Sequence, residues 1–153
     1  MTWLENRIPP LLIVALFGLA MAYCAGMFGM VSVHFTGQHW VALALLALGF
    51  AVVMAAVVQF RRARTTVDPR HPEAASTLVR GGIFGFSRNP MYLGMALALA
   101  SWAVFLGNAL ALLLVAGFVA WINRFQITPE ERALRARFGS EFDRYAGQVR
   151  RWI

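Results

Sequence analysis

The sequence contains no lysine, few acidic residues and a single cysteine, and these scarcities exclude several classes of protein. Only 14% of the 153 residues are charged, whereas 59% are apolar. A soluble domain usually carries about 25% charged residues, so this composition does not suit an ordinary soluble fold. Because the apolar residues also form long uninterrupted blocks, the sequence indicates a membrane protein.

The single cysteine and the few histidines give no metal-binding pattern. Cys24 lies inside an apolar block, where we interpret it as a packing residue, and one cysteine allows neither an intrachain disulfide nor a cysteine metal cluster. His34 and His39 lie in a short polar linker without nearby cysteine or carboxylate, which favours interfacial polar residues over metal ligands. The sequence therefore predicts no metal site.

The charge that is present is strongly positive, and its position favours membrane lipids over nucleic acid as partners. All 14 basic residues are arginines, and the net charge is +7. All arginines and all seven acids lie in residues 1–7, 61–90 and 123–153, next to the apolar blocks. The positive-inside rule places these regions and both termini in the cytoplasm. We expect a multi-pass protein, located in a bacterial inner membrane.

Four apolar segments predict four transmembrane helices in a single membrane domain that covers residues 1–153. The predicted spans are residues 8–33, 40–60, 91–106 and 108–122. The first two reach the roughly 20 residues that a bilayer-spanning helix needs. The last two have about 15 residues each, or roughly 23 Å at the helical rise per residue. Gly107-Asn108 is a strong turn signal between them, so they form a short hairpin.

The remaining C-terminal residues predict amphipathic helices on the cytoplasmic face. Thr128-Pro129-Glu130-Glu131 has the form of a capping box with proline at the first helical position. Gly139-Ser140 predicts a break between two short helices, with Ser140 capping the second. The apolar stripe at helical spacing consists of Leu134, Phe138, Phe142, Tyr145 and Val149. The expected fold is an all-α integral membrane protein with four transmembrane helices and C-terminal helices on the membrane surface.

Two polar stretches at the ends of the predicted hairpin carry groups that suit a ligand site. The first is Ser87-Arg88-Asn89-Pro90-Met91-Tyr92-Leu93-Gly94, and the second is Glu130-Glu131. The arginine fork suits a ligand carboxylate, the tyrosine offers a hydroxyl, and either glutamate can accept hydrogen bonds from an amine or ribose. Each residue alone also has a plain structural explanation, as a positive-inside arginine, a helix-starting proline, an interfacial tyrosine or a capping glutamate.

In combination, these stretches resemble the isoprenylcysteine carboxyl methyltransferase and phospholipid methyltransferase superfamily. The resemblance continues upstream in Leu78-Val79-x-x-Gly82-x-Phe84 and downstream in Phe138-Gly139-x-Glu141-Phe142-x-x-Tyr145-x-x-x-Val149-Arg150. It covers residues 65–153, which we expect to be the cofactor-binding half of the chain. Members of this superfamily are integral membrane enzymes that transfer a methyl group from S-adenosylmethionine.

The resemblance implies a set of site residues. The expected catalytic residues are Arg88, Tyr92 and Glu131. The expected residues for binding S-adenosylmethionine are Arg88, Asn89, Pro90, Tyr92, Gly94, Glu130, Glu131 and Tyr145. In this interpretation Pro90 sets the turn, Gly94 leaves room for the cofactor, and Arg144 and Tyr145 close the site.

The resemblance defines the acceptor less closely than the cofactor. The carboxyl methyltransferases usually have histidine where this chain has Asn89, and asparagine-proline is closer to the phospholipid N-methyltransferases, whereas Arg88 is closer to the carboxyl enzymes. The expected acceptor is a lipophilic molecule or lipid, such as an isoprenylcysteine-like carboxylate or a phospholipid amine. An ammonium acceptor must first lose a proton, for which a glutamate, Tyr92 or His71 is available. The alternative is a non-catalytic membrane scaffold or lipid-binding protein that keeps the fold.

Overall fold

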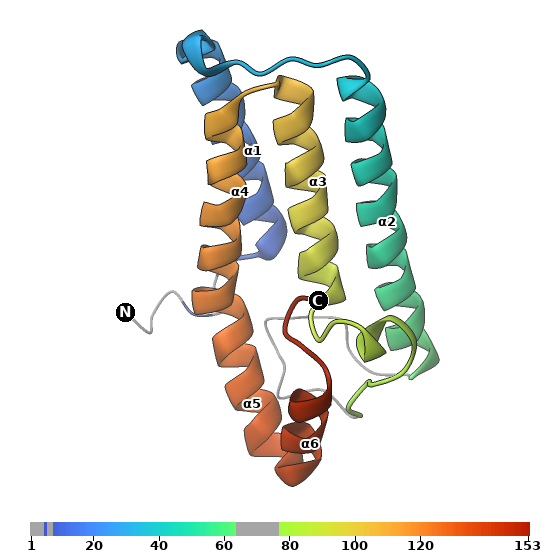
Figure 1. Cartoon of the computed structure of the whole chain (residues 1–153). Helices are drawn as coiled ribbons and strands as arrows, with labels where there is room; N and C mark the ends of the chain where they lie inside the picture. Colours follow the sequence, from blue (N-terminus) through green and yellow to red (C-terminus); the bar gives the residue numbers. More distant parts are fainter. Residues whose placement is uncertain (1–4, 6–7, 64–76) are drawn as a thin grey trace.

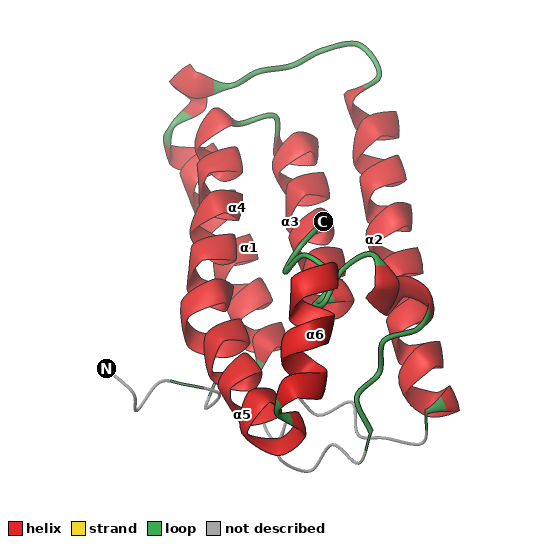
Figure 2. Ribbon diagram, turned by 60° about the horizontal axis from the view of Figure 1, so that its bottom comes forward, coloured by secondary structure: helices red, strands yellow, loops and turns green. Residues whose placement is uncertain are grey.

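The computed structural model describes residue 5, residues 8–63 and residues 77–153, and these residues form helices without a β-strand (Figure 1, Figure 2). The long helices lie side by side, and shorter ones extend from one end of this bundle (Figure 1). The helices are α1 (Pro10–Met27), η2 (Gly29–Val31), α2 (Gln38–Arg62), η4 (Gly82–Gly85), α3 (Pro90–Leu106), α4 (Ala109–Ile122), η5 (Asn123–Ile127), α5 (Thr128–Phe138) and α6 (Ser140–Gln148).

In the described part of the chain, three helices are long and apolar enough to cross a membrane. They are α1, α2 and a continuous helix from Ala109 to Phe138 that joins α4, η5 and α5, while α3 is apolar but shorter, with 17 residues. Large apolar side chains remain exposed along the bundle, among them Leu11, Leu19, Trp40, Phe50 and Leu113. Such a surface is stable when lipid surrounds it. Together with their length, these helices indicate an integral membrane protein.

The predicted spans agree with the helices of the structure except at the C-terminal end of the first span. Residues 91–106 and 108–122 coincide with α3 and α4 to within one residue. The turn between them is confirmed, because Gly107 has a positive φ of 58° and the Asn108 side chain accepts a hydrogen bond from the Leu110 amide at 2.9 Å. The first span was placed too long, at 8–33: α1 ends at Met27, and a 3₁₀ turn follows it.

The predicted capping box is wrong, because α5 does not start a new helix. The chain passes from α4 through the π-helical segment η5 directly into α5. The Thr128 hydroxyl therefore donates to the Asn123 carbonyl, at 2.7 Å, instead of accepting from an amide at a free helix start. Each π turn inserts an extra residue and changes which side chains face the bundle.

The break between α5 and α6 is confirmed, but its cap differs from the prediction. Gly139 has a φ of 53°, which suits glycine and ends α5. The residue that precedes α6 is this glycine, so Ser140 is already the first helical residue and makes no capping hydrogen bond.

The core lies where α1, α3 and α4 meet. Met21, Phe118 and Ile122 are fully buried, and Phe17 meets Phe118 edge to face with ring centroids 5.7 Å apart. Tyr92 and Trp152 pack against the same cluster at the end from which α5 and α6 extend. The core thereby fixes the start of α3 relative to the end of the chain.

A close backbone contact joins α2 to α3. A side-chain carbon on Gly94 would lie 2.4 Å from Val53 Cγ2 and 2.7 Å from the Gly49 carbonyl oxygen, and one on Gly49 would lie 2.8 Å from the Gly94 oxygen. Small residues allow such approach between membrane helices. The space that we predicted Gly94 to leave for a ligand is therefore filled by α2.

We predict that Gly94→Ala destabilises the protein by about 1–3 kcal/mol, because the added methyl group overpacks this contact. Gly147→Ala is the matched control, since a side chain there meets nothing within 4 Å. The measurement is thermal unfolding of both variants in the same detergent, and equal melting temperatures would contradict the packing role.

Candidate cofactor site

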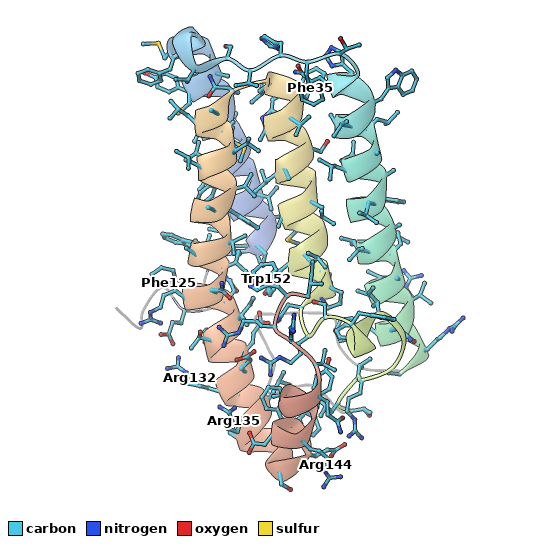
Figure 3. The ribbon with its side chains drawn as sticks, viewed as in Figure 1. Phe35, Phe125, Arg132, Arg135, Arg144 and Trp152 are labelled. Atoms are coloured by element: carbon cyan, nitrogen blue, oxygen red, sulfur yellow. The ribbon has the colours of Figure 1, made fainter. Side chains whose placement is uncertain are left out.

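The predicted site residues gather at one end of the bundle, where α3 starts and α5 and α6 lie (Figure 1). Pro90 is buried and opens α3, where its missing amide hydrogen costs little. The turn before it is held by the Asn89 amide, which donates to Ser87 Oγ at 3.1 Å. Charged side chains such as Arg132 and Arg144 also project at this end, while Phe35 lies at the other (Figure 3).

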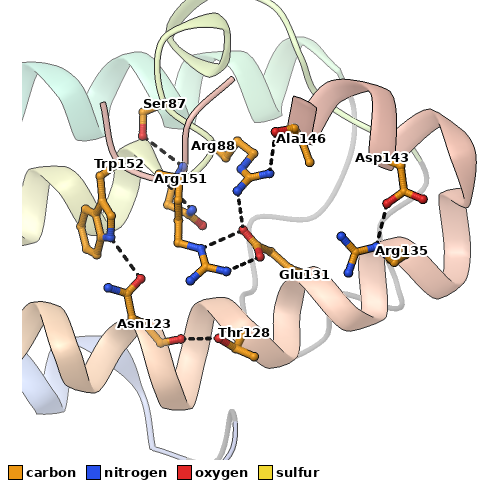
Figure 4. A network of polar contacts seen from close by, with 11 residues as sticks. Ser87, Arg88, Asn123, Thr128, Glu131, Arg135, Asp143, Ala146, Arg151 and Trp152 are labelled. Carbon is orange, nitrogen blue, oxygen red and sulfur yellow. Dashed lines mark hydrogen bonds and ion pairs between the residues drawn. The ribbon is translucent and has the colours of Figure 1, made fainter. Parts of the chain in front are cut away.

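The centre of the site is the carboxylate of Glu131, which two arginines share (Figure 4). Arg88 Nη2 lies 3.1 Å from Oε1, and Arg151 contacts both oxygens, with Nε 3.2 Å from Oε1 and Nη2 2.6 Å from Oε2. The Glu131 and Arg88 side chains are only 13% and 14% exposed. Because these hydrogen bonds are charge-assisted and shielded from water, they hold the three side chains in fixed positions.

The neighbouring glutamate has a different partner. The Tyr92 hydroxyl donates a hydrogen bond to Glu130, and Tyr92 is only 4% exposed. The two adjacent carboxylates, which the sequence could not distinguish, thus lie in different chemical environments.

Tyr145 is buried, and it secures the loop that leads into the motif. Its hydroxyl donates to the Phe84 carbonyl at 2.7 Å, which ties α6 to η4. Burial raises the pKa of Tyr145 to about 12, while the nearby Arg88 and Arg80 charges act in the opposite direction. Arg144, in contrast, has an exposed side chain. His71 lies outside the described residues.

The sequence did not indicate that the C-terminal tail would reach this site. The Arg88 amide donates to the Arg150 carbonyl at 3.1 Å, and Asn89 Nδ2 donates to the Arg151 carbonyl at 2.9 Å. Trp152 Nε1 donates to Asn123 Oδ1 at 3.1 Å. Asn89 and Arg151 are 62 residues apart in sequence, so no local pattern could have found these contacts.

Several other charged side chains at this end pair with one another and not with Glu131. Glu5 binds Arg124 at 2.9 Å and also Arg132, and the hydrogen bond from Arg124 is the main reason that the pKa of Glu5 is lowered. Arg135 binds Asp143 at 2.7 Å. The contact between Arg151 and Glu131 is therefore specific within a generally basic surface.

We predict that Glu131→Gln lowers the free energy of unfolding by about 1–3 kcal/mol, because it leaves the mostly buried Arg88 without a counter-charge. Glu141→Gln serves as the control, since its carboxylate is 46% exposed and pairs with Arg80 on the surface. Denaturation of the two variants in detergent measures their free energies of unfolding. Equal losses of stability in Glu131→Gln and Glu141→Gln would contradict the prediction, because they would make the Glu131 pair only a surface contact.

Comparison with known proteins identifies the family. The chain matches the phospholipid methyltransferase family over residues 37–141, a range that includes both polar stretches of the site. An uncharacterized protein of Haemophilus influenzae is 49% identical over 63 residues, which are 41% of this chain and 100% of that protein. No solved structure shows significant similarity. The match covers more than half of the chain, and the protein therefore belongs to the phospholipid methyltransferase family.

Proposed function

We propose that this protein is a membrane enzyme that transfers a methyl group from S-adenosylmethionine to a lipophilic acceptor at the cytoplasmic face. The observation that carries the proposal is the meeting of Arg88, Tyr92, Glu130 and Glu131 at one end of the bundle, inside the region that matches the family. In the sequence, one of these stretches lies at the start of the α3–α4 hairpin and the other follows its end.

The proposed membrane arrangement has four spans, with α3 as the short one and both termini in the cytoplasm of a bacterial cell. Supporting this arrangement, Arg61 and Arg62 end α2 at the same end of the bundle as the site, whereas the α3–α4 turn at Gly107 carries no charge. Three helices in the described part of the chain are long enough to cross the bilayer between these two ends. The shorter α3 lies between neighbouring helices, which shield it from lipid on both sides.

The residues at the site fit S-adenosylmethionine. Arg88 Nε is buried without a hydrogen-bond partner, so the site has an unused donor for an acceptor atom of a ligand. Tyr92 supplies an aromatic face beside it, and the hydrogen bond from its hydroxyl to Glu130 fixes the ring in place. When bound, the cofactor would supply an activated methyl group to a nucleophilic acceptor, and Arg88, Tyr92 and Glu131 would hold and orient it. The protein aligns the two molecules and excludes water.

We further propose that the acceptor is a lipid amine, which the family match and the Asn89-Pro90 dipeptide support. An ammonium group must lose a proton before its nitrogen can attack. Glu131 is held by two guanidinium groups, whereas Glu130 is bonded to a tyrosine hydroxyl. Glu130 is thus the carboxylate that takes the proton from the ammonium and passes it to water.

Calorimetric titration of S-adenosylhomocysteine into the detergent-purified protein tests the cofactor site. We expect micromolar binding by the wild type and a loss of at least tenfold in Glu131→Gln and Tyr92→Phe, since each change removes a polar contact that shapes the site. Glu141→Gln should bind like the wild type. A wild-type protein that is folded but binds no S-adenosylhomocysteine would favour the non-catalytic scaffold.

The proton-transfer role of Glu130 gives a separate expectation. Glu130→Gln should lower methyl transfer to aminolipid in mixed micelles by about 100-fold or more, because it removes the general base. Its affinity for S-adenosylhomocysteine should stay within a few-fold of the wild type. Radiolabelled methyl transfer measures the first quantity and calorimetry the second. Loss of binding in parallel with activity would assign Glu130 to the cofactor instead.

A further inference from the structure

The last five residues of the chain return from α6 to the start of α3 and are held there at several points (Figure 1). Trp152 donates to Asn123 and packs against the core, and the two preceding carbonyls accept hydrogen bonds from Arg88 and Asn89. Because the backbone of the tail makes these contacts, the side chain of Arg151 is carried to a defined position beside Glu131.

The group formed by Arg88, Glu131 and Arg151 has a net positive charge. Two guanidinium groups and one carboxylate sum to +2 − 1 = +1. Both oxygens of Glu131 are already engaged by the arginines, as the dashed contacts in Figure 4 show. Glu131 therefore positions the two arginines, and the charge left for a ligand is positive.

Unused hydrogen-bond donors accompany this positive charge. Arg88 Nε is buried and has no partner. Arg151 uses Nε and Nη2 on Glu131, and its Nη1 has no hydrogen bond within the described part of the chain. The Arg151 side chain is 37% exposed, so a ligand can reach it from solvent. Guanidinium donors of this kind bind oxyanions such as carboxylates and phosphates.

We propose that Arg151, together with Arg88, binds the carboxylate of the amino-acid part of S-adenosylmethionine. This inference rests on the proposed function. It gives Glu131 the role of a positioning residue, which orients both guanidinium groups, and it makes the C-terminal tail a wall of the cofactor site. The phosphodiester of a lipid headgroup is the other source of a singly charged oxyanion, and the experiment separates the two.

The test compares two ligands that differ in the amino-acid part. S-adenosylhomocysteine carries the carboxylate, whereas 5′-methylthioadenosine has the same nucleoside and sulfur without it. Each is titrated calorimetrically into the wild type, Arg151→Gln and Arg135→Gln. Arg135 is the matched control because it also carries a positive charge within electrostatic reach of Glu131 but contacts Asp143.

We expect Arg151→Gln to weaken S-adenosylhomocysteine binding by at least tenfold and to leave 5′-methylthioadenosine binding unchanged, since only the first ligand has the group that Arg151 contacts. Arg135→Gln should bind both ligands like the wild type. Arg151→Lys should lose less than Arg151→Gln, because it keeps the charge but not the planar fork. This variant also keeps the test valid if the glutamine variant is poorly folded.

Other outcomes overturn the inference in distinguishable ways. Equal weakening of both ligands in Arg151→Gln would show that the tail only supports the fold of the site. Unchanged binding of both, with weaker binding of soluble glycerophosphoethanolamine, would assign the arginine to a lipid phosphate. Either result leaves the proposed methyltransferase function intact. Absence of S-adenosylhomocysteine binding by the folded wild type contradicts the proposed function as well.

Discussion

The site depends on one carboxylate, that of Glu131, which lies between two guanidinium groups from distant parts of the chain. Arg88 comes from the turn before α3 and Arg151 from the C-terminal tail, so a single α5 side chain joins three segments. Hydrogen bonds from Arg88 and Asn89 to carbonyls of the tail already join the turn to the tail, and the Glu131 carboxylate adds α5 to both. Removing the carboxylate would leave two guanidinium groups facing each other without a counter-charge.

Much of the fold could be predicted from the sequence because long apolar blocks have few stable alternatives in lipid. The positions of α3 and α4 could be predicted from the lengths of two apolar segments, and the turn between them from the glycine at position 107. The start of α5 could not be predicted, because a threonine and a proline look like a helix start whether or not the preceding helix has ended. The structure shows that it has not, and a π segment joins the two.

The sequence predicts which residues form the site better than it predicts which of their side chains contact each other. Glu130 and Glu131 are neighbours, and neighbouring side chains on a helix point about 100° apart. Which of them meets Tyr92 and which meets the arginines depends on helix phase, and η5 alters that phase just before α5. The partner Arg151 depends on tertiary contacts of the tail, for which the sequence gives no local signal.

The continuity of α4, η5 and α5 fixes the distance between Glu130 and the end of α4. Glu130 follows the end of α4 at Ile122 by eight residues along one unbroken helix, which corresponds to about 12 Å at the helical rise. A flexible linker would let this height vary, whereas a continuous helix holds it constant. In a bilayer the carboxylates would stand at a set depth, near the headgroups. Under the proposed function, acceptors would be selected by the height at which they present their reactive atom, independently of the length of the chains beneath.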